Sequence, residues 1–349
     1  MKVLGKGLLT GAAFGVAAGL AVGGTAFAAD ELVINSFGGS YEKLHRKLVI
    51  TPFEKQHNVK VKVVTSYSGQ TLAALRAQKA NPQFDVVHLS GGLEAIAAKD
   101  GLLAPIKASE LSNHKNMYPF AVSGIAEGRG PMYSIAVIGI LYNTEKVKKA
   151  PTSWMDLARV DLRGRVLVTD AASNTYGMLG FMMMNKANGG TLENIGPGLG
   201  FVKKLLPHAT LVSKSPEIQQ NFAQGNAYIA AYAQDYAYTL TKAGLPVKFI
   251  LPKEGAALAP ITVNLVAGRK NRALALKFID FSIRAAASKG WAEGLRYAPT
   301  NKQVKLTGDV AKQVVYGPEA VKKLTSFDWL KVGQMRPKWN EAWKRTIAK

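Results

Sequence analysis

Three units of one kind follow one another in the first hundred residues: a short apolar strand, a polar loop rich in glycine and serine, and a helix. The hydrophobic patterns predict strands at residues 32–34, 59–65 and 84–89 and helices at residues 41–56, 70–79 and 93–99. This alternation is typical of a parallel sheet that is covered by its crossover helices. The predicted fold class is therefore α/β.

The same alternation returns further along the chain. Residues 166–169 are predicted to form a strand that enters the polar loop 170–174, and a methionine-rich helix follows at residues 178–186. A second sheet is therefore expected. Since the chain has 349 residues, two lobes of ordinary domain size suit it better than one.

Two extended, apolar segments are predicted to be strands that cross between the lobes, at residues 132–142 and 261–266. Helices predicted at residues 273–287 and 318–324 would then complete the first lobe, which makes the domains discontinuous. The predicted division is a signal peptide at residues 1–28, a first part of lobe 1 at 29–137, lobe 2 at 138–258, and the completion of lobe 1 with C-terminal helices at 259–349.

Residues 1–29 have the order of a secretory signal peptide: two lysines, an uncharged stretch rich in glycine and alanine, and an Ala-Phe-Ala exit that ends at Ala28. An uncleaved membrane anchor is the alternative, because the stretch is long enough to cross a bilayer and glycine recurs at every fourth residue from Gly7 to Gly23. Acidic residues follow at once, without a basic stop-transfer cluster. We therefore expect cleavage after Ala28 and a periplasmic protein.

Composition excludes several classes of protein. The chain has no cysteine, which excludes disulfides, thiolate nucleophiles, thiolate metal sites and a lipidated cleavage site. The formal net charge is +22, but the basic residues are spread along the whole chain and do not interleave with aromatic residues in a stripe. We therefore expect a basic, solvated surface and no nucleic-acid partner.

Several segments carry a family resemblance that extends over most of the chain. They are the signal peptide and residues 35–41, 84–87, 244–249, 251–255, 271–281 and 298–301. Together they resemble the extracellular solute-binding proteins of the spermidine/putrescine type. The resemblance implies a periplasmic-binding-protein type II fold, with two lobes that each have a central, mostly parallel sheet and flanking helices, joined by two crossing strands and closing on the ligand by a hinge motion. It also implies a monomeric periplasmic receptor without a cofactor, which delivers a small solute to an ABC permease in the inner membrane.

The chain departs from the polyamine receptors of that family at the ligand loops. Those receptors carry a tryptophan and an acid where this chain has residues 36–41, and another tryptophan and an aspartate where it has residues 258–261. Of an acidic pair in the second lobe only Asp170 remains. Because a buried diammonium ligand needs carboxylates, we expect a small polar solute of the carboxylate or amino-acid type, with a polyamine as the alternative.

The ligand is expected outside the carboxyl ends of the strands, where the Gly/Ser-rich loops fall. Glycines before a helix can present backbone N–H groups to an anion, although they can also simply permit a tight turn. If residues 227–231 form a strand, Tyr232 stands at its end as an aromatic wall; if they are helical, the neighbouring tyrosines face the core. The predicted ligand contacts are Phe37, Ser40, Tyr41, Tyr67, Ser90, Asp170, Ser173, Tyr176, Tyr232 and Asp235.

A secreted hydrolase is the alternative from another functional class. The chain lacks the Gly-x-Ser-x-Gly, His-Glu-x-x-His and Ser-x-x-Lys signatures, and residues 196–200 resemble a phosphate loop only superficially and are predicted to begin a helix. The five histidines lack metal-ligand spacing, and we expect them at the surface or at helix caps. The sequence thus predicts neither a catalytic nor a metal site.

Overall fold

The structure, a computed structural model, describes residues 31–347. The predicted signal peptide and its cleavage site lie outside these residues. None of the helices within the described range combines the length and the apolar character that are needed to cross a membrane.

Within residues 31–347, the strands form one hydrogen-bonded sheet in the order β2-β1-β3-β9-β4-β7-β5-β6, with β8 beside β4 and β10 beside β9. β1 runs parallel to β2 and β3, and β5 runs parallel to β6 and β7, which confirms the predicted α/β class. The strands are β1 (Glu31–Ser36), β2 (Lys60–Thr65), β3 (Val86–Ser90), β4 (Met132–Asn143), β5 (Val166–Thr169), β6 (Ala209–Val212), β7 (Ile229–Ala233), β8 (Val247–Ile250), β9 (Ala256–Leu265) and β10 (Leu324–Thr325).

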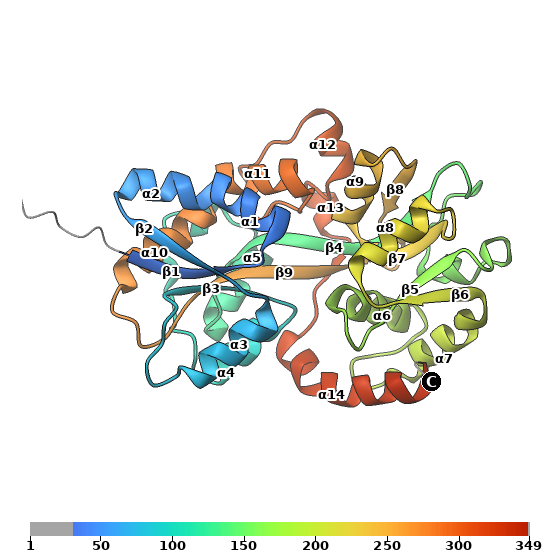
Figure 1. Ribbon diagram of the computed structural model, residues 1–349, viewed down its shortest axis with the longest axis horizontal. Helices are drawn as coiled ribbons and strands as arrows, with labels where there is room; N and C mark the ends of the chain where they lie inside the picture. The colour runs from blue at the N-terminus through green and yellow to red at the C-terminus, as the bar shows by residue number, and fades with distance from the viewer. Residues whose placement is uncertain (1–30, 348–349) are drawn as a thin grey trace, which may run out of the picture.

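The helices pack around two ends of this sheet, which we call lobe 1 (around β1, β2 and β3) and lobe 2 (around β5, β6, β7 and β8) (Figure 1). Lobe 1 is covered mainly by α1 to α5, α10 and α11, and lobe 2 by α6 to α9. The helices are α1 (Gly39–His45), α2 (Thr51–His57), α3 (Ser68–Ala77), α4 (Leu93–Lys99), α5 (Pro119–Val122), α6 (Thr175–Ala187), α7 (Gly196–Leu205), α8 (Ser215–Ala223), α9 (Gln234–Lys242), α10 (Arg272–Ser282), α11 (Ala285–Leu295), α12 (Gly308–Gln313), α13 (Pro318–Val321) and α14 (Trp329–Thr346).

The two lobes share the long strands β4 and β9 (Figure 1). Every residue of both strands is buried, as is typical of strands that are covered on both faces of a sheet. The two strands pair antiparallel, so hydrogen bonding continues from one lobe into the other instead of stopping between two separate sheets. β9 begins at Ala256, five residues before the predicted strand. The sequence did not indicate this early start, because Ala256–Pro260 contains no β-branched residue that would signal a strand.

Helix α14 contacts both lobes. Its Gly333 lies against Ile96 of α4, and the ring of its Trp343 lies 5.1 Å from the ring of Phe181 in α6. Figure 1 shows α14 running below the two lobes, from near α4 to α7. The C-terminal helix therefore links the lobes and is not confined to one of them.

The Pro-Lys-Glu-Gly segment, residues 252–255, fixes the start of β9. Ser153 Oγ donates a hydrogen bond of 2.5 Å to the Glu254 carboxylate, and the indole nitrogen of Trp154 donates one of 2.8 Å to the Gly255 carbonyl. Ser153 is the N-cap of the 3₁₀ helix η5 (Trp154–Ala158), and Trp154 is its first residue. The motif thus ties η5 to the crossing strand.

Candidate functional site

The lobe 1 side of the predicted site is a wall of aromatic rings. The ring of Phe37, in the loop after β1, lies 4.9 Å from that of Tyr41 and is stacked at 6.4 Å on that of Tyr67. Tyr41 in turn is stacked at 4.7 Å on Trp291 of α11. Three of the predicted contacts are therefore brought together on one apolar surface, which carries no charged side chain of its own.

The lobe 2 side is built around Tyr232, the last residue but one of β7, and the segment is a strand as one of the two interpretations of the sequence predicts. Tyr232 is fully buried, and its hydroxyl and that of Ser215 lie 2.5 Å apart. Its ring lies 5.5 Å from Tyr176 and 4.8 Å from Tyr236, both edge-on. Because α9 starts directly after β7, the next turn brings Asp235 to the same place.

Asp235 is the unusual charge of this region. Its Oδ1 atom is buried and has no hydrogen-bond partner among the described residues. Burial raises the pKa of its carboxyl group to about 7, and the backbone N–H groups of Asp235 and Tyr236 oppose this only in part. A carboxylate held in this way lacks a counter-ion, and a cationic group in contact with Oδ1 would supply one.

The two walls meet at Tyr297, which follows α11. Burial raises the pKa of its phenol and of that of Tyr176 well above the usual range, and each phenol also shifts the pKa of the other. The ring of Tyr297 lies 6.2 Å from Trp291 in a stacked orientation. Nearby, a Cβ atom at Gly91 would lie 2.8 Å from Thr175 Cγ2, so the loop after β3 touches the start of α6 directly. The lobes are therefore in contact around one continuous set of rings.

Other predicted contacts are engaged within their own loops. The Asp170 carboxylate accepts hydrogen bonds from the backbone of Ala172 and from Ser173 Oγ, and Ser90 shares a hydrogen bond with Ser68. Ser40 lies exposed in the first turn of α1. Of the ten predicted residues, the structure thus brings two groups together: Phe37, Tyr41 and Tyr67 on lobe 1, and Tyr176, Tyr232 and Asp235 on lobe 2.

Sequence reasoning missed Trp291, Tyr236 and Tyr297 as parts of these walls. Tyr297 directly precedes residues 298–301, which carried the family resemblance, so its neighbourhood was a usable signal. The sequence gives no signal that Trp291 belongs to the site, because it lies on a helix whose hydrophobic pattern is that of ordinary core packing.

The expectation that the histidines lie at the surface or at helix caps is wrong for His45 and His88, which are fully buried in lobe 1. Their rings lie 4.6 Å apart, beneath Tyr41 and Trp291. His88 Nδ1 lies 2.8 Å from the Asn35 carbonyl, which can only accept, so Nδ1 carries the proton. Burial lowers the pKa of His88 to about 4 and that of His45 well below its usual value, so both rings are neutral. Among the described residues the Nδ1 atom of each ring has a hydrogen-bond partner, Ser36 for His45 and Asn35 for His88, whereas both Nε2 atoms are buried without one.

A family model described as bacterial extracellular solute-binding protein matches residues 49–316. The chain is 27% identical over 280 residues to the spermidine/putrescine-binding periplasmic protein of Escherichia coli, covering 78% of this chain and 80% of the relative. It is 24% identical over 299 residues to the gamma-aminobutyric acid-binding protein of Pseudomonas aeruginosa, covering 81% and 82%. These relatives are binding proteins and not enzymes.

The crystal structure of an ABC transporter protein from Clostridium perfringens superposes on the chain with a TM-score of 0.79 at 24% identity, covering 90% of this chain and 99% of that one. This likeness confirms the periplasmic-binding-protein type II fold. With the family match, it identifies the chain as a member of the bacterial extracellular solute-binding protein family, whose members bind a small solute for an ABC transporter.

Proposed function

We propose that the protein captures a small, amine-bearing organic solute of the amino-acid type between its lobes, with the ammonium group on Asp235. The observation that carries this proposal is the buried Oδ1 atom of Asp235, which has no partner among the described residues. An ammonium group would pair with it and keep the carboxyl group ionised. Such a charge-assisted hydrogen bond is stronger than a neutral one.

The surrounding rings support the same class of ligand. The negative charge of Asp235 helps to raise the pKa of four tyrosine hydroxyls, which therefore lie near it. They are those of Tyr176, Tyr232, Tyr236 and Tyr297. Aromatic faces also attract a cation. Tyr176 and Tyr232 belong to lobe 2, and Tyr297 follows α11 of lobe 1. A ligand held among them contacts both lobes when they are closed and only one when they are open, so it stabilises the closed arrangement.

The cellular setting belongs to the same proposal. The protein is exported, its signal peptide is removed after Ala28, and it works in the periplasm as a monomer that hands the solute to an ABC permease. It makes and breaks no bond, and it binds no nucleic acid. The N-terminal sequence and the periplasmic relatives support this setting.

We also propose that the hinge crossings lie at residues 137–138 and 258–259, the boundaries that the sequence predicts. Val137 and Leu258 are register partners in the β4–β9 pair, so the two crossings lie opposite each other. Opposed crossings let the lobes rotate about one line.

A polyamine is the second candidate, and the name of the Escherichia coli relative favours it. A polyamine would bury two ammonium groups, and each needs a carboxylate partner. Asp170 already accepts hydrogen bonds from Ala172 and Ser173, so of the predicted contacts Asp235 is the carboxylate that is available. The first candidate, with one ammonium group, is therefore favoured.

A thermal-shift screen of ω-amino acids, α-amino acids, polyamines and carboxylates without an amine tests the proposal. A true ligand at roughly 100 times its Kd adds about 2.7 kcal/mol of stability. Amino acids should raise the Tm, and carboxylates without an amine should not. The Asp235→Asn variant should lose the response to amino acids, whereas the exposed Glu319→Gln variant, which also removes one negative charge, is the matched control and should respond as the wild type does. A response to carboxylates alone would overturn the assignment of the ammonium group to Asp235.

A further inference from the structure

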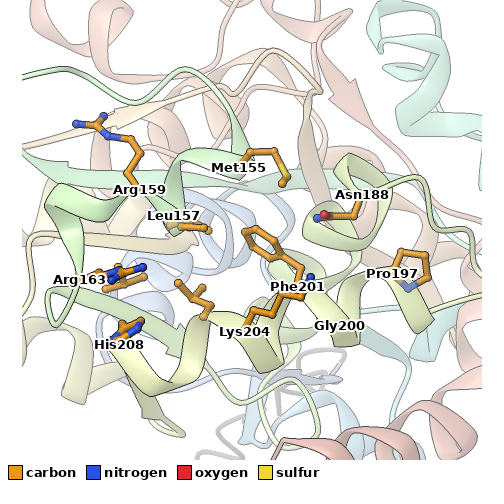
Figure 2. A pocket seen from close by; sticks show the side chains of 13 residues that line it. Met155, Leu157, Arg159, Arg163, Asn188, Pro197, Gly200, Phe201, Lys204 and His208 are labelled. Atoms are coloured by element: carbon orange, nitrogen blue, oxygen red, sulfur yellow. The ribbon is translucent and has the colours of Figure 1, made fainter.

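A hollow in the described part of the chain lies away from the interlobe rings, between η5 and α7 of lobe 2 (Figure 2). Its volume is about 660 Å³, which falls within the range of small-molecule sites. It is lined by Val166, the first residue of β5, and by His208, which directly precedes β6. It therefore lies at the amino ends of these parallel strands, opposite the end that leads to Asp170 and the predicted solute site.

One part of this hollow is apolar. Phe201 and Leu205 of α7 line it from one side, and Met155 and Leu157 of η5 line it from the other. Met155 is 41% exposed although it is a large apolar side chain. Met155 therefore offers apolar surface at the mouth of the hollow that no side chain of the described residues covers fully.

The other part is basic. Arg163, Lys204 and His208 line it, and no aspartate or glutamate is among the lining residues. Arg159 also borders the hollow, but the carboxylate of Asp161 neutralises it at 2.5 Å. Within the described chain, the side chains of Arg163, Lys204 and His208 make no hydrogen bond or ion pair. The positive charge at this end is therefore available to a ligand.

The two parts have a definite order. Figure 2 shows Arg163 and His208 close together at one end, the ring of Phe201 in the middle, and Asn188 and Pro197 at the opposite end. Lys204 and Phe201 project from the same face of α7, since they are three residues apart. An occupant would thus meet charge at one end and apolar surface along its body.

We propose that this hollow, the lobe 2 pocket, binds a free organic anion with an apolar body, typified by a medium-chain alkyl carboxylate. The carboxylate lies against Arg163 and His208, the chain lies over Phe201, Leu205 and Met155, and Lys204 adds positive charge beside Phe201. Arginine holds a carboxylate with two parallel hydrogen bonds, and burial of the alkyl chain adds the hydrophobic term. The site is independent of the solute site, because none of its lining residues is among the interlobe contacts.

Methyl NMR of the protein with ¹³C-labelled methionine tests this proposal directly, with Met155→Leu identifying the Met155 signal. The probes are octanoate, octan-1-ol and octylammonium, which share one chain and differ in charge. Octanoate should shift the Met155 signal saturably, octan-1-ol should bind at least about tenfold more weakly, and octylammonium should leave the signal in place.

The Arg163→Gln/Lys204→Gln variant should bind octanoate at least about tenfold more weakly than the wild type does, and its affinity for octan-1-ol should be unchanged. Lys146→Gln/Lys203→Gln removes two exposed charges outside the lining and should bind octanoate as the wild type does. Equal shifts with octanoate and octylammonium, or unchanged octanoate binding in the first variant, would overturn the proposal. If phosphatidylglycerol vesicles shift the Met155 signal and octanoate does not, the hollow is a membrane contact and the proposal of an organic-anion site is wrong.

Discussion

The two walls of the interlobe site differ in chemistry. The lobe 1 wall, formed by Phe37, Tyr41, Tyr67 and Trp291, offers ring faces and no charge. The lobe 2 wall carries a buried carboxylate among tyrosine hydroxyls. If the solute binds between these walls as proposed, the difference teaches that the two lobes have different roles: lobe 1 would supply contact area for any apolar body, and lobe 2 would select for a cation.

The largest effect is expected from Asp235→Asn. This variant keeps the shape of the lobe 2 wall and removes its charge, so the affinity for an amine should fall about a hundredfold, as for the loss of one partner of a buried charge pair. Isothermal calorimetry on both proteins measures this. An equal loss for a neutral, isosteric ligand would contradict the division of roles, because it would mean that Asp235 acts through shape.

The walls should also respond to pH in opposite directions. The folded-state pKa of His88, about 4, lies below its ordinary value of 6.5, so the unfolded chain binds more protons between these values. Stability from His88 is therefore fully present above pH 6.5 and is lost as the pH falls towards 4, by about 3 kcal/mol. Urea unfolding at several pH values should show this loss, and His88→Gln should remove most of it. An unchanged pH profile in His88→Gln would exclude the buried ring as its source.

For Asp235 the change of stability with pH has the opposite sign. Its folded-state pKa of about 7 lies above the ordinary 3.8, so its carboxyl group favours the folded state most below pH 3.8, and this contribution is lost as the pH rises to 7. The unliganded Asp235→Asn variant should therefore have a higher free energy of unfolding than the wild type at pH 8 and a smaller advantage at pH 5. Equal stability of the two proteins at pH 8 would mean that the carboxylate is not strained by burial.

Phe37→Ala tests the other half of the comparison with a smaller effect. The ring is only partly buried, and its loss removes stacking on Tyr67 without opening the core. Affinity should fall about tenfold for amines and for neutral ligands alike, because aromatic contact does not depend on the charge. A loss confined to amines would show that lobe 1 also reads charge.

The smallest effect is expected from Tyr232→Phe. The change removes the hydrogen bond to Ser215 and keeps the ring, so it should lower the free energy of unfolding by about 1 kcal/mol. Thermal unfolding measures it, with Tyr238→Phe on α9 as a comparison.

Much of the fold could be predicted from the sequence because its strands and helices have strong local patterns. The predicted strand at residues 166–169 and the predicted helix at residues 93–99 have the bounds that the structure gives to β5 and α4. Gly91 and Gly92 both have positive φ, as expected of glycines in tight turns before a helix.

The site was less predictable, because its chemistry depends on long-range contacts. Nothing local distinguishes Trp291 from a core residue, yet it stacks on Tyr41, which lies 250 residues earlier in the chain. The burial of His88 depends on the carbonyl of Asn35, across the β1–β3 pair. Asp235 had a local signal, since it follows a strand end, but its missing partner is visible only once the tyrosines around it are placed.

Proton release on ligand binding tests the central claim most directly. At pH 6 the carboxyl group of unliganded Asp235 is mostly protonated, and an ammonium ligand needs it ionised, so binding should release close to one proton. Calorimetry of an amine ligand in buffers of different ionisation enthalpy counts that proton. We expect release of nearly one proton by the wild type and of none by Asp235→Asn, with affinity rising about tenfold per pH unit below pH 7 in the wild type only. Binding without proton release in the wild type would contradict the pairing of Asp235 with the ligand's ammonium group.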